Sequence, residues 1–239
     1  MKIDVAFLPS LIKKENFTNY TCIVLDIFRA SGSIITAGMN GCKQITPLLT
    51  IEDAKILANS KPAALLAGER KSIKIEGFHF GNSPREFIAN KVNNKEIIMT
   101  TSNGTRAIKS TNENITFIGG FLNANAICQK ALSLQQNILI ICAGTENDFS
   151  LEDALCAGYM VNIIQEQHHQ VALTDSALAS LLLFAQAKDT LLQTATNSKN
   201  GQRLADLGLY EDMEYCFQIN ITNIIPEYKN NIITFQQLQ

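Results

Sequence analysis

Five short apolar runs, each ending in small or polar residues, constrain the fold of this chain more than any other feature. They are CIVLDIF (22–28), PAALLAG (62–68), EIIMTT (96–101), NITFIGG (114–120) and NILIICAG (137–144). Continuous apolar runs of this length are typical of strands that are buried on both faces of a parallel sheet. The first ten residues, MKIDVAFLPS, indicate a further strand rather than a signal peptide, because they contain one Lys, an early Asp and no small-residue cleavage site.

Helical patterns lie between these runs. Residues 50–60 have Thr50 as an N-cap and apolar residues at positions 51, 54, 57 and 58, and residues 122–134 and 150–167 repeat the pattern. The alternation of strand and helix predicts an α/β fold around a mainly parallel sheet, and the length of 239 residues suits a single domain over 1–239. The apolar helix predicted from residue 175 is expected to face the core or a second subunit, and residues 194–202 are predicted to form a mobile loop.

Charge, hydropathy and cysteine spacing exclude several classes of protein. A net charge of −2 gives no basic footprint for nucleic acid, and no apolar run reaches the roughly 18 residues of a membrane span. The six cysteines contain no CxxC pair, which argues against a zinc ribbon. They are interpreted as buried free thiols of a cytoplasmic protein.

Three strand-to-helix junctions carry most of the chemistry, at residues 23–41, 96–110 and 138–158. In a parallel sheet such junctions share the carboxyl edge, where α/β folds bind ligands and where helix N-termini favour anions. Their polar residues are Asp26, Arg29, Ser31, Ser33, Thr101, Asn103, Thr105, Arg106, Thr145, Glu146, Ser150, Glu152 and Asp153.

Each junction also has a purely structural interpretation. Asn103-Gly104 is a common turn dipeptide, Thr105 could cap a helix, and residues 150–153 are close to a capping box. Arg29 and Arg106 could equally form salt bridges or clamp a phosphate. A fourth stretch, residues 65–87, combines a long loop with a Ser-Pro helix start, and such a loop is more often functional than decorative.

The common phosphate-binding signatures are absent. The chain has neither GxxxxGK[ST] nor GxGxxG, so it is neither a P-loop nor a dinucleotide-binding protein. Asp26 stands where a haloacid-dehalogenase-type phosphatase has its nucleophile, but the residue two positions later is Phe28. Cys22 lies one residue too far from Arg29 for a Cys-x5-Arg phosphatase loop.

Taken together, LDIFRAS (25–31), AGERKSIKIEGFHFGNSP (67–84), TTSNGTRAI (100–108) and CAGTENDFSLEDALCAG (142–158) resemble the 2-phosphosulfolactate phosphatases, the ComB family. Residues 198–226 resemble that family's C-terminal part. The resemblance implies a three-layer α/β sandwich, a homodimer and Mg²⁺-dependent hydrolysis of 2-phospho-3-sulfolactate to 3-sulfolactate and phosphate. In methanogens this step belongs to coenzyme M biosynthesis.

Phosphoryl transfer depends on charge neutralisation and alignment, which assigns tasks to the polar residues. Arg29, Arg70 and Arg106 are expected to bind phosphate and sulfonate. The predicted catalytic residues are Asp26, Arg29, Arg106 and Asp153. The predicted substrate-binding residues are Ser31, Ser33, Arg70, Asn82, Ser83, Thr101, Asn103, Gly104, Thr105 and Thr145. The candidate Mg²⁺ ligands are the carboxylates Asp26, Glu69, Glu146, Glu152 and Asp153.

Two alternatives stay open at this point. The chain departs from the family pattern at Ser31-Gly32-Ser33, His79, Asn147-Asp148 and Asn220, so its substrate could be another small 2-phospho acid, such as phospholactate or phosphoglycolate. A non-enzymatic protein that binds small anions would use the same sheet edge. The carboxylates discriminate between these classes, because a Mg²⁺ enzyme needs them beside the phosphate and an anion receptor does not.

Overall fold

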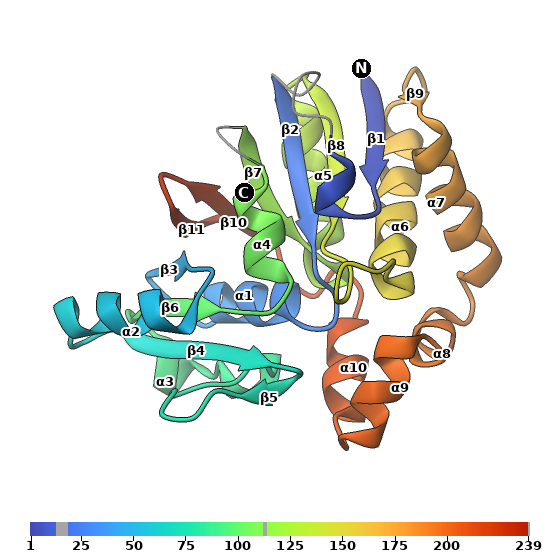
Figure 1. Ribbon diagram of the computed structural model, residues 1–239. Coiled ribbons are helices and arrows are strands. Elements are labelled where there is room, and N and C mark those ends of the chain that lie inside the picture. The colour runs from blue at the N-terminus through green and yellow to red at the C-terminus, as the bar shows by residue number, and fades with distance from the viewer. Residues whose placement is uncertain (13–18, 112–113, 239) are drawn as a thin grey trace.

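The computed structural model describes residues 1–12, 19–111 and 114–238, and it confirms an α/β fold with a large, mostly parallel sheet flanked by helices (Figure 1). All of the strands predicted from apolar runs are present. They are β1 (Lys2–Ala6), β2 (Tyr20–Leu25), β4 (Leu65–Arg70), β6 (Glu96–Thr100), β7 (Ile115–Gly119) and β8 (Asn137–Cys142). The assignment of the chain to a single domain stays a prediction.

The remaining strands complete one sheet of eleven strands within the described residues. They are β3 (Gln44–Pro47), β5 (Ile73–Lys74), β9 (Ala172–Leu173), β10 (Ile224–Lys229) and β11 (Ile232–Gln237). The order is β5-β4-β6-β3-β11-β10-β7-β2-β8-β1-β9. Two parallel blocks, β4-β6-β3 and β7-β2-β8-β1-β9, are therefore joined by the β10–β11 hairpin.

The direction of the two blocks follows from this hairpin. β7 pairs antiparallel with β10, β10 with β11, and β11 with β3. After three reversals, the β3 block runs opposite to the β7 block along the sheet. The sheet also turns sharply between them, so that β2 and β4 run in clearly different directions and both point toward the middle of the molecule (Figure 1). The carboxyl ends of both blocks converge there.

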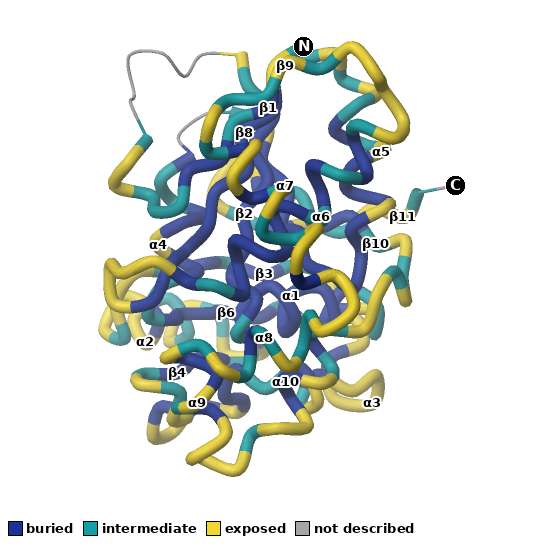
Figure 2. The backbone as a smooth tube through the Cα atoms, turned by 90° about the vertical axis from the view of Figure 1, so that its right-hand side faces the viewer, coloured by how far each residue is buried: buried dark blue, intermediate teal, exposed yellow. Residues whose placement is uncertain are grey.

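Both faces of the β7 block are covered, as its continuous apolar runs predict. Ile23, Leu25 and Ile140 pack with α5 (Ala124–Ser133) and α6 (Leu151–Gln167), whereas Val24 and Leu139 belong to the core on the other face, with α1 (Ala30–Met39) and α4 (Gly104–Lys109). Successive residues of a strand point to opposite faces, so one run supplies both cores. Figure 2 shows these strands as buried tubes through the middle of the molecule.

The other helices are α2 (Ile51–Ser60), α3 (Ala89–Val92), α7 (Asp175–Ala187), α8 (Leu191–Thr196), α9 (Lys199–Asp206) and α10 (Tyr210–Cys216), with 3₁₀ turns η1 (Pro9–Leu11), η3 (Pro84–Glu86) and η4 (Phe121–Asn123). The predicted cap of α2 is confirmed, because the Thr50 hydroxyl accepts from the Asp53 backbone N–H at 3.0 Å. Within the described residues, no helix combines the length and apolar character that crossing a membrane requires.

The prediction of a mobile loop over residues 194–202 is wrong, because α8 and α9 occupy most of it. Ser198 caps α9 by accepting from the Gly201 N–H at 3.0 Å. Gly201 is needed because the carbonyl oxygens at the end of α8 lie where a side chain would be. The small polar residues that suggested a loop are thus a helix cap and a close contact between two helices.

The apolar helix predicted from residue 175 is present as α7, with Leu178 and Leu182 on its exposed side. Its buried side packs closely on α6, where the Ser180 carbonyl faces Gly158. The helix therefore faces the core in part. A role of its exposed side in a subunit interface stays a prediction.

Candidate active site

A small pocket lies where the carboxyl ends of the two parallel blocks converge. Its volume is about 50 Å³, which suits a small anionic group. The lining residues are Asp26, Phe28, Arg29, Glu69, Lys71, Ser72, Asn82, Ser102, Asn103, Glu146 and Arg203. Larger hollows occur elsewhere, such as one of about 510 Å³ beside Lys43, Lys61 and Glu96, but those three side chains already form surface ion pairs.

Asp26 directly follows β2 and is almost fully buried, with 8% of its surface exposed. Hydrogen bonds to its backbone and to its side chain hold it in place. Its N–H donates to the Ser31 hydroxyl at 2.9 Å, and its carboxylate accepts from the Ala30 N–H at 3.4 Å. Burial and the nearby charge of Glu69 raise the pKa of Asp26 to about 7. The pocket therefore contains a carboxyl group that can exchange a proton near neutral pH.

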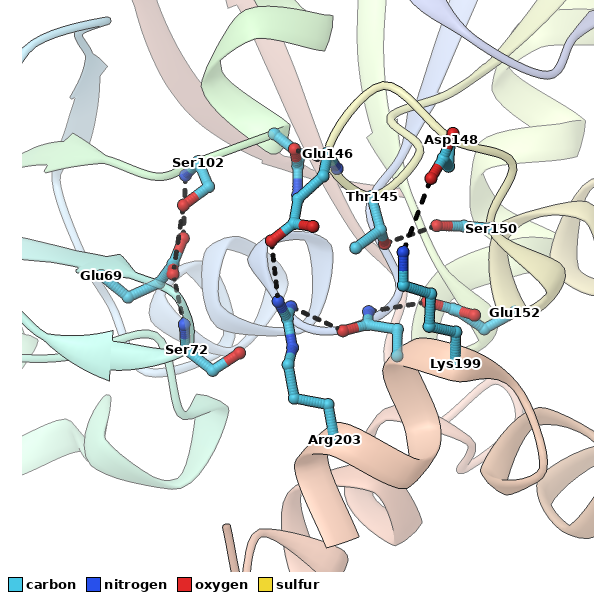
Figure 3. A network of polar contacts seen from close by, with 12 residues as sticks. Glu69, Ser72, Ser102, Thr145, Glu146, Asp148, Ser150, Glu152, Lys199 and Arg203 are labelled. Carbon is cyan, nitrogen blue, oxygen red and sulfur yellow. Dashed lines mark hydrogen bonds and ion pairs between the residues drawn. The ribbon is translucent and has the colours of Figure 1, made fainter. Parts of the chain in front are cut away.

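Glu69 is the penultimate residue of β4 and joins the two loops on its side of the pocket (Figure 3). One carboxylate oxygen accepts from the Ser102 N–H at 2.8 Å, and the other accepts from the Ser72 N–H at 2.8 Å. Lys71 and Ser72 form the turn between β4 and β5 with φ of 53° and 67°, a conformation that is uncommon outside glycine. Glu69 thus stabilises a strained turn at the edge of the pocket.

Arg29 is fixed by a residue far away in the sequence. Its Nη1 donates to Asp212 Oδ2 at 2.5 Å and its Nη2 donates to the Ser72 carbonyl at 2.9 Å. The Ser83 hydroxyl donates to the other Asp212 oxygen at 2.6 Å. Both side chains of the ion pair are at least 96% buried, so the guanidinium is held firmly in the pocket wall. The salt bridge expected as one use of Arg29 is present, and its partner is Asp212 of α10.

Asn82 lies on the pocket with only 5% of its surface exposed. Its backbone carbonyl accepts from the Ser33 hydroxyl at 2.8 Å. Its side-chain Oδ1 is buried and has no hydrogen-bond partner within the described residues. A buried acceptor of this kind is rare in native proteins and points to a ligand or water that would donate to it.

Glu146, after β8, lies on the far side of the pocket from Glu69. It is connected to Asn103, whose side-chain oxygen accepts from the Glu146 N–H at 3.3 Å. Arg203 of α9 reaches toward it, with 3.4 Å between Arg203 Nη1 and Glu146 Oε1 (Figure 3). Four strand ends and one C-terminal helix thus contribute to the same pocket.

Asp153 and Glu152 do not line the pocket, although the sequence predicts them as catalytic or metal-binding residues. Asp153 is buried beneath it and accepts from the Ile27 N–H at 2.8 Å and the Gly144 N–H at 3.1 Å. Glu152 accepts from Asn200 at 2.8 Å and from a serine hydroxyl. Burial raises the pKa of both carboxyls, and their mutual repulsion raises that of Asp153 further. Their geometry indicates that they hold the junctions after β2 and β8 in place.

The hydroxyl cluster after β6 also differs from expectation. The Thr101 hydroxyl accepts from the Thr105 N–H at 3.0 Å, and the Thr105 hydroxyl donates to the Thr101 carbonyl at 2.9 Å. The two threonines therefore satisfy each other and do not face the pocket. Two other residues of the predicted anion cradle do lie at the site. Asn103 lines the pocket, and Gly104 lies against Asp26.

Two predicted anion-binding arginines lie outside the pocket. Arg70 donates to backbone carbonyls of Glu69 and Thr100 and to the Thr100 hydroxyl. Both terminal nitrogens of its guanidinium are therefore already bonded to strand residues. Arg106 is exposed and donates to Asn147 at 2.8 Å. Their positions follow from local geometry that a linear sequence does not give, since a residue after a strand can point away from the edge.

The predicted serine and threonine ligands have structural tasks in the described structure. Ser31 and Ser33 bond to backbone groups of residues 26 and 82, and Ser83 bonds to Asp212. Thr145 shares a hydrogen bond of 2.7 Å with Ser150. His79, too, has a structural role, because its Nδ1 accepts from the Leu66 N–H at 3.0 Å. All six cysteines are buried and free, as predicted.

Sequence reasoning missed several residues of this site. The pocket residues not predicted are Phe28, Lys71, Ser72, Ser102 and Arg203, and the missed partner of Arg29 is Asp212. Ser102 and Ser72 could have been found by their positions beside predicted residues. Arg203 and Asp212 lie in the 198–226 stretch, whose resemblance to the family gives no task to individual residues.

Two carboxylates that line the pocket suit Mg²⁺ as ligands. No group of three or more His, Cys, Asp or Glu in the described part of the chain has the geometry of a metal site. Mg²⁺ usually needs only one or two carboxylates and takes its other ligands from water and phosphate. Asp26 and Glu69 meet that requirement, because both line the pocket and the charge of Glu69 raises the pKa of Asp26.

Comparisons with known proteins agree on one family. The family model described as 2-phosphosulpholactate phosphatase matches residues 6–231. A probable 2-phosphosulfolactate phosphatase of Clostridium acetobutylicum is 40% identical over 235 residues, which cover 98% of this chain and 100% of the relative. One of the same name from Clostridium kluyveri is 41% identical over 243 residues, covering 100% of this chain and 99% of the relative.

The raised pKa of Asp26 predicts how stability changes with pH. An unfolded Asp titrates near pH 4 and folded Asp26 near 7, so between these values the folded protein binds more protons than the unfolded chain. The free energy of unfolding should therefore fall as pH rises through this window. Asp26→Asn removes this titrating group. Between pH 5 and pH 8, the free energy of unfolding of the variant should therefore rise by roughly 1 kcal/mol or more relative to that of the parent. Urea unfolding of both proteins in EDTA measures this, and a pH-independent difference would contradict it.

Gly104 gives a second test of the site, because a Cβ at this position would lie 2.7 Å from Asp26 Oδ2 and 2.7 Å from the Ala30 Cβ. Gly104→Ala must displace the Asp26 carboxylate or α1, and we expect turnover to fall at least about tenfold. The matched control is Gly77→Ala, which meets no atom within 4 Å but has a φ of +79°. It should lower stability by about 1 kcal/mol and leave turnover unchanged. Equal turnover of Gly104→Ala and the parent would show that Asp26 tolerates displacement.

Proposed function

Because the chain belongs to the 2-phosphosulpholactate phosphatase family, we propose that it hydrolyses 2-phospho-3-sulfolactate to 3-sulfolactate and phosphate with Mg²⁺. Family membership makes the chain a phosphoric monoester hydrolase. One observation carries the assignment to this pocket. Asp26 and Glu69, two buried carboxylates from different strands, stand beside the fixed guanidinium of Arg29.

The charges of the pocket suit a phosphate monoester. Such a group carries about two negative charges at neutral pH, and its transfer requires neutralisation of these charges and alignment of the attacking oxygen. Asp26 and Glu69 would hold Mg²⁺, which supplies positive charge at the phosphate when bound. Arg29 has N–H groups beyond those bonded to Asp212 and Ser72, and these are free to donate to phosphate oxygens.

Alignment follows from how the pocket residues are fixed. Asp212 and the Ser72 carbonyl orient the Arg29 guanidinium, so little conformational entropy is lost when it binds phosphate. Glu69 fixes Ser102, whose backbone N–H and hydroxyl both bond to the Glu69 carboxylate. The unpartnered Asn82 Oδ1 is an acceptor for a donor on the substrate or on a bound water.

Two other functions remain as alternatives, for different reasons. A phosphatase for another small 2-phospho acid would use the same pocket, since phosphate and carboxylate are common to phosphosulfolactate, phospholactate and phosphoglycolate. A non-enzymatic anion receptor is less compatible, because two buried carboxylates would repel its ligand without a cation. The homodimer, the cytoplasmic location and a place in coenzyme M biosynthesis stay predictions.

The activity is tested by phosphate release from phosphosulfolactate, phospholactate and phosphoglycolate, each with Mg²⁺ and with EDTA. We expect release from phosphosulfolactate with the highest kcat/KM, and its loss in EDTA because the charge of the phosphate is then not neutralised. Restoration by added Mg²⁺ is the control. Release from none of the three substrates would favour the anion receptor, and undiminished release in EDTA would contradict the role of Mg²⁺.

Asp26→Asn should abolish most of the activity while the protein remains folded. A nucleophile or metal ligand contributes roughly 4 kcal/mol or more to transition-state stabilisation, so turnover should fall about a thousandfold. The matched control is Asp148→Asn, since Asp148 is exposed on a neighbouring loop and forms only a surface ion pair with Lys199. It should stay within about twofold of the parent. Turnover of Asp26→Asn within about tenfold of the parent would show that Asp26 has a structural role.

A further inference from the structure

Arg203 differs from the other basic residues of the pocket in where it comes from and in how it is bonded. Arg29 is committed to Asp212, and Lys71 is exposed at the tip of the β4–β5 turn. Arg203 comes from α9, in the C-terminal helical segment, and reaches into the pocket from the side opposite Glu69 (Figure 3). It is thus a further positive charge on the pocket, on a different element from Arg29 and Lys71.

The hydrogen bonds of Arg203 leave part of its guanidinium available. Nη2 donates to the Asn200 side chain at 2.8 Å, which fixes the plane of the group. Nη1 lies 3.4 Å from Glu146 Oε1, a long contact for a charge-assisted hydrogen bond. Nε is buried and has no partner within the described residues. A buried donor without an acceptor is destabilising, so a ligand or a bound water is expected to accept from Nε.

The hydrogen bonds that hold Arg203 in place also indicate a preformed binding site. Asn200, which accepts from Arg203, donates through its own amide to the buried Glu152 at 2.8 Å. Glu152 in turn accepts from the Ser198 hydroxyl at the start of α9 at 3.2 Å. These contacts fix the helix that carries Arg203 to the β8–α6 junction. The guanidinium is therefore held in one orientation before any ligand binds, and a buried carboxylate lies behind it.

We propose that Arg203 binds the sulfonate of the substrate and thereby determines specificity, with Glu146 as a counter-ion that gives way when the sulfonate binds. This inference rests on the proposed function. In phosphosulfolactate the carboxylate is attached to the carbon that bears the phosphate ester, whereas the sulfonate is one carbon further away. Arg203 lies across the pocket from Glu69, so it suits the more distant group. A guanidinium fork and a sulfonate match in geometry, because two adjacent N–H groups face two oxygens of one tetrahedral anion.

The test compares two substrates that differ in the sulfonate alone, phosphosulfolactate and phospholactate. For Arg203→Gln we expect KM for phosphosulfolactate to rise about tenfold or more, while KM for phospholactate changes less than about twofold. Arg203→Lys should be intermediate, because it keeps the charge and loses the fork. An equal loss with both substrates would overturn the proposal, since Arg203 would then bind the phosphate or the carboxylate.

A matched control separates ligand binding from a tether between α9 and the β8–α6 loop. Lys199 and Asp148 join the same two segments at 3.6 Å, but both are more than 70% exposed and neither lines the pocket (Figure 3). Lys199→Gln should leave the KM of both substrates unchanged. If it reproduces the substrate-selective effect of Arg203→Gln, the tether explains the effect and the proposal is wrong.

Glu146→Gln tests the counter-ion. Removing its charge frees Arg203, so KM for phosphosulfolactate should fall by about twofold to fivefold, while KM for phospholactate should not fall. A loss of kcat with both substrates would instead show that Glu146 acts on the phosphate or its metal, and would overturn this part of the proposal.

Direct binding keeps the inference testable if the parent releases no phosphate. Calorimetric titration with 3-sulfolactate, and with lactate as the probe that lacks the sulfonate, needs no turnover. The parent should bind 3-sulfolactate at least about tenfold more tightly than Arg203→Gln does, and lactate should show no such difference. Failure of the proposed function appears as an inactive parent, whereas failure of this inference appears as equal binding by the parent and Arg203→Gln.

Discussion

The β10–β11 hairpin is the element on which the rest of the structure depends. It pairs with β7 on one side and with β3 on the other, and it reverses the chain direction between two parallel blocks. Without it, each block would have an edge strand with unpaired backbone groups. With it, and with the sharp turn of the sheet, Asp26 from one block and Glu69 from the other line the same pocket. Thus the position of the site is a property of the whole sheet and not of a single junction.

The pocket is surrounded by carboxylates that are costly to bury. Asp26, Glu152 and Asp153 all have raised pKa values, chiefly because they are desolvated. Each accepts hydrogen bonds that offset part of this penalty, and for Asp26 and Asp153 the donors are backbone N–H groups at the start of a helix or a turn. A raised pKa means that these carboxyls bind protons more readily than exposed ones, and a bound cation at the pocket would favour the ionised form of Asp26. Proteins tolerate such a loss of stability mainly where function requires it.

The sequence predicts most of the parallel strands, but neither the β10–β11 hairpin nor the directions in which side chains point. Continuous apolar runs indicate buried parallel strands, and β1, β2, β4, β6, β7 and β8 lie where these runs predict. By contrast, Arg70 and Arg203 could not be distinguished from local pattern. Arg70 is the last residue of β4 and bonds within the sheet, whereas Arg203 comes directly after the residues 194–202 that are predicted as a loop and lies in α9. The pairing of Arg29 with Asp212 joins residues 183 positions apart, and only the folded chain brings them together.

The place of the hairpin in the chain has a consequence for how the site comes into being. β10 and β11 follow every other described strand, so the ribosome delivers them last among these strands. Until residues 224–237 emerge, the two parallel blocks have no strand between them, and the α8–α10 segment that supplies Arg203 and Asp212 has only just been made. Inside the β7 block, the β2–β8 and β1–β8 pairings already join residues 117 and 135 positions apart, at Tyr20–Asn137 and Ile3–Ile138. The β11–β3 pairing that unites the blocks joins Ile233 with Ile45, 188 positions apart, and cannot form before the hairpin is made. The pocket is therefore assembled after translation of nearly the whole chain, and a nascent chain with both blocks folded still lacks a complete site.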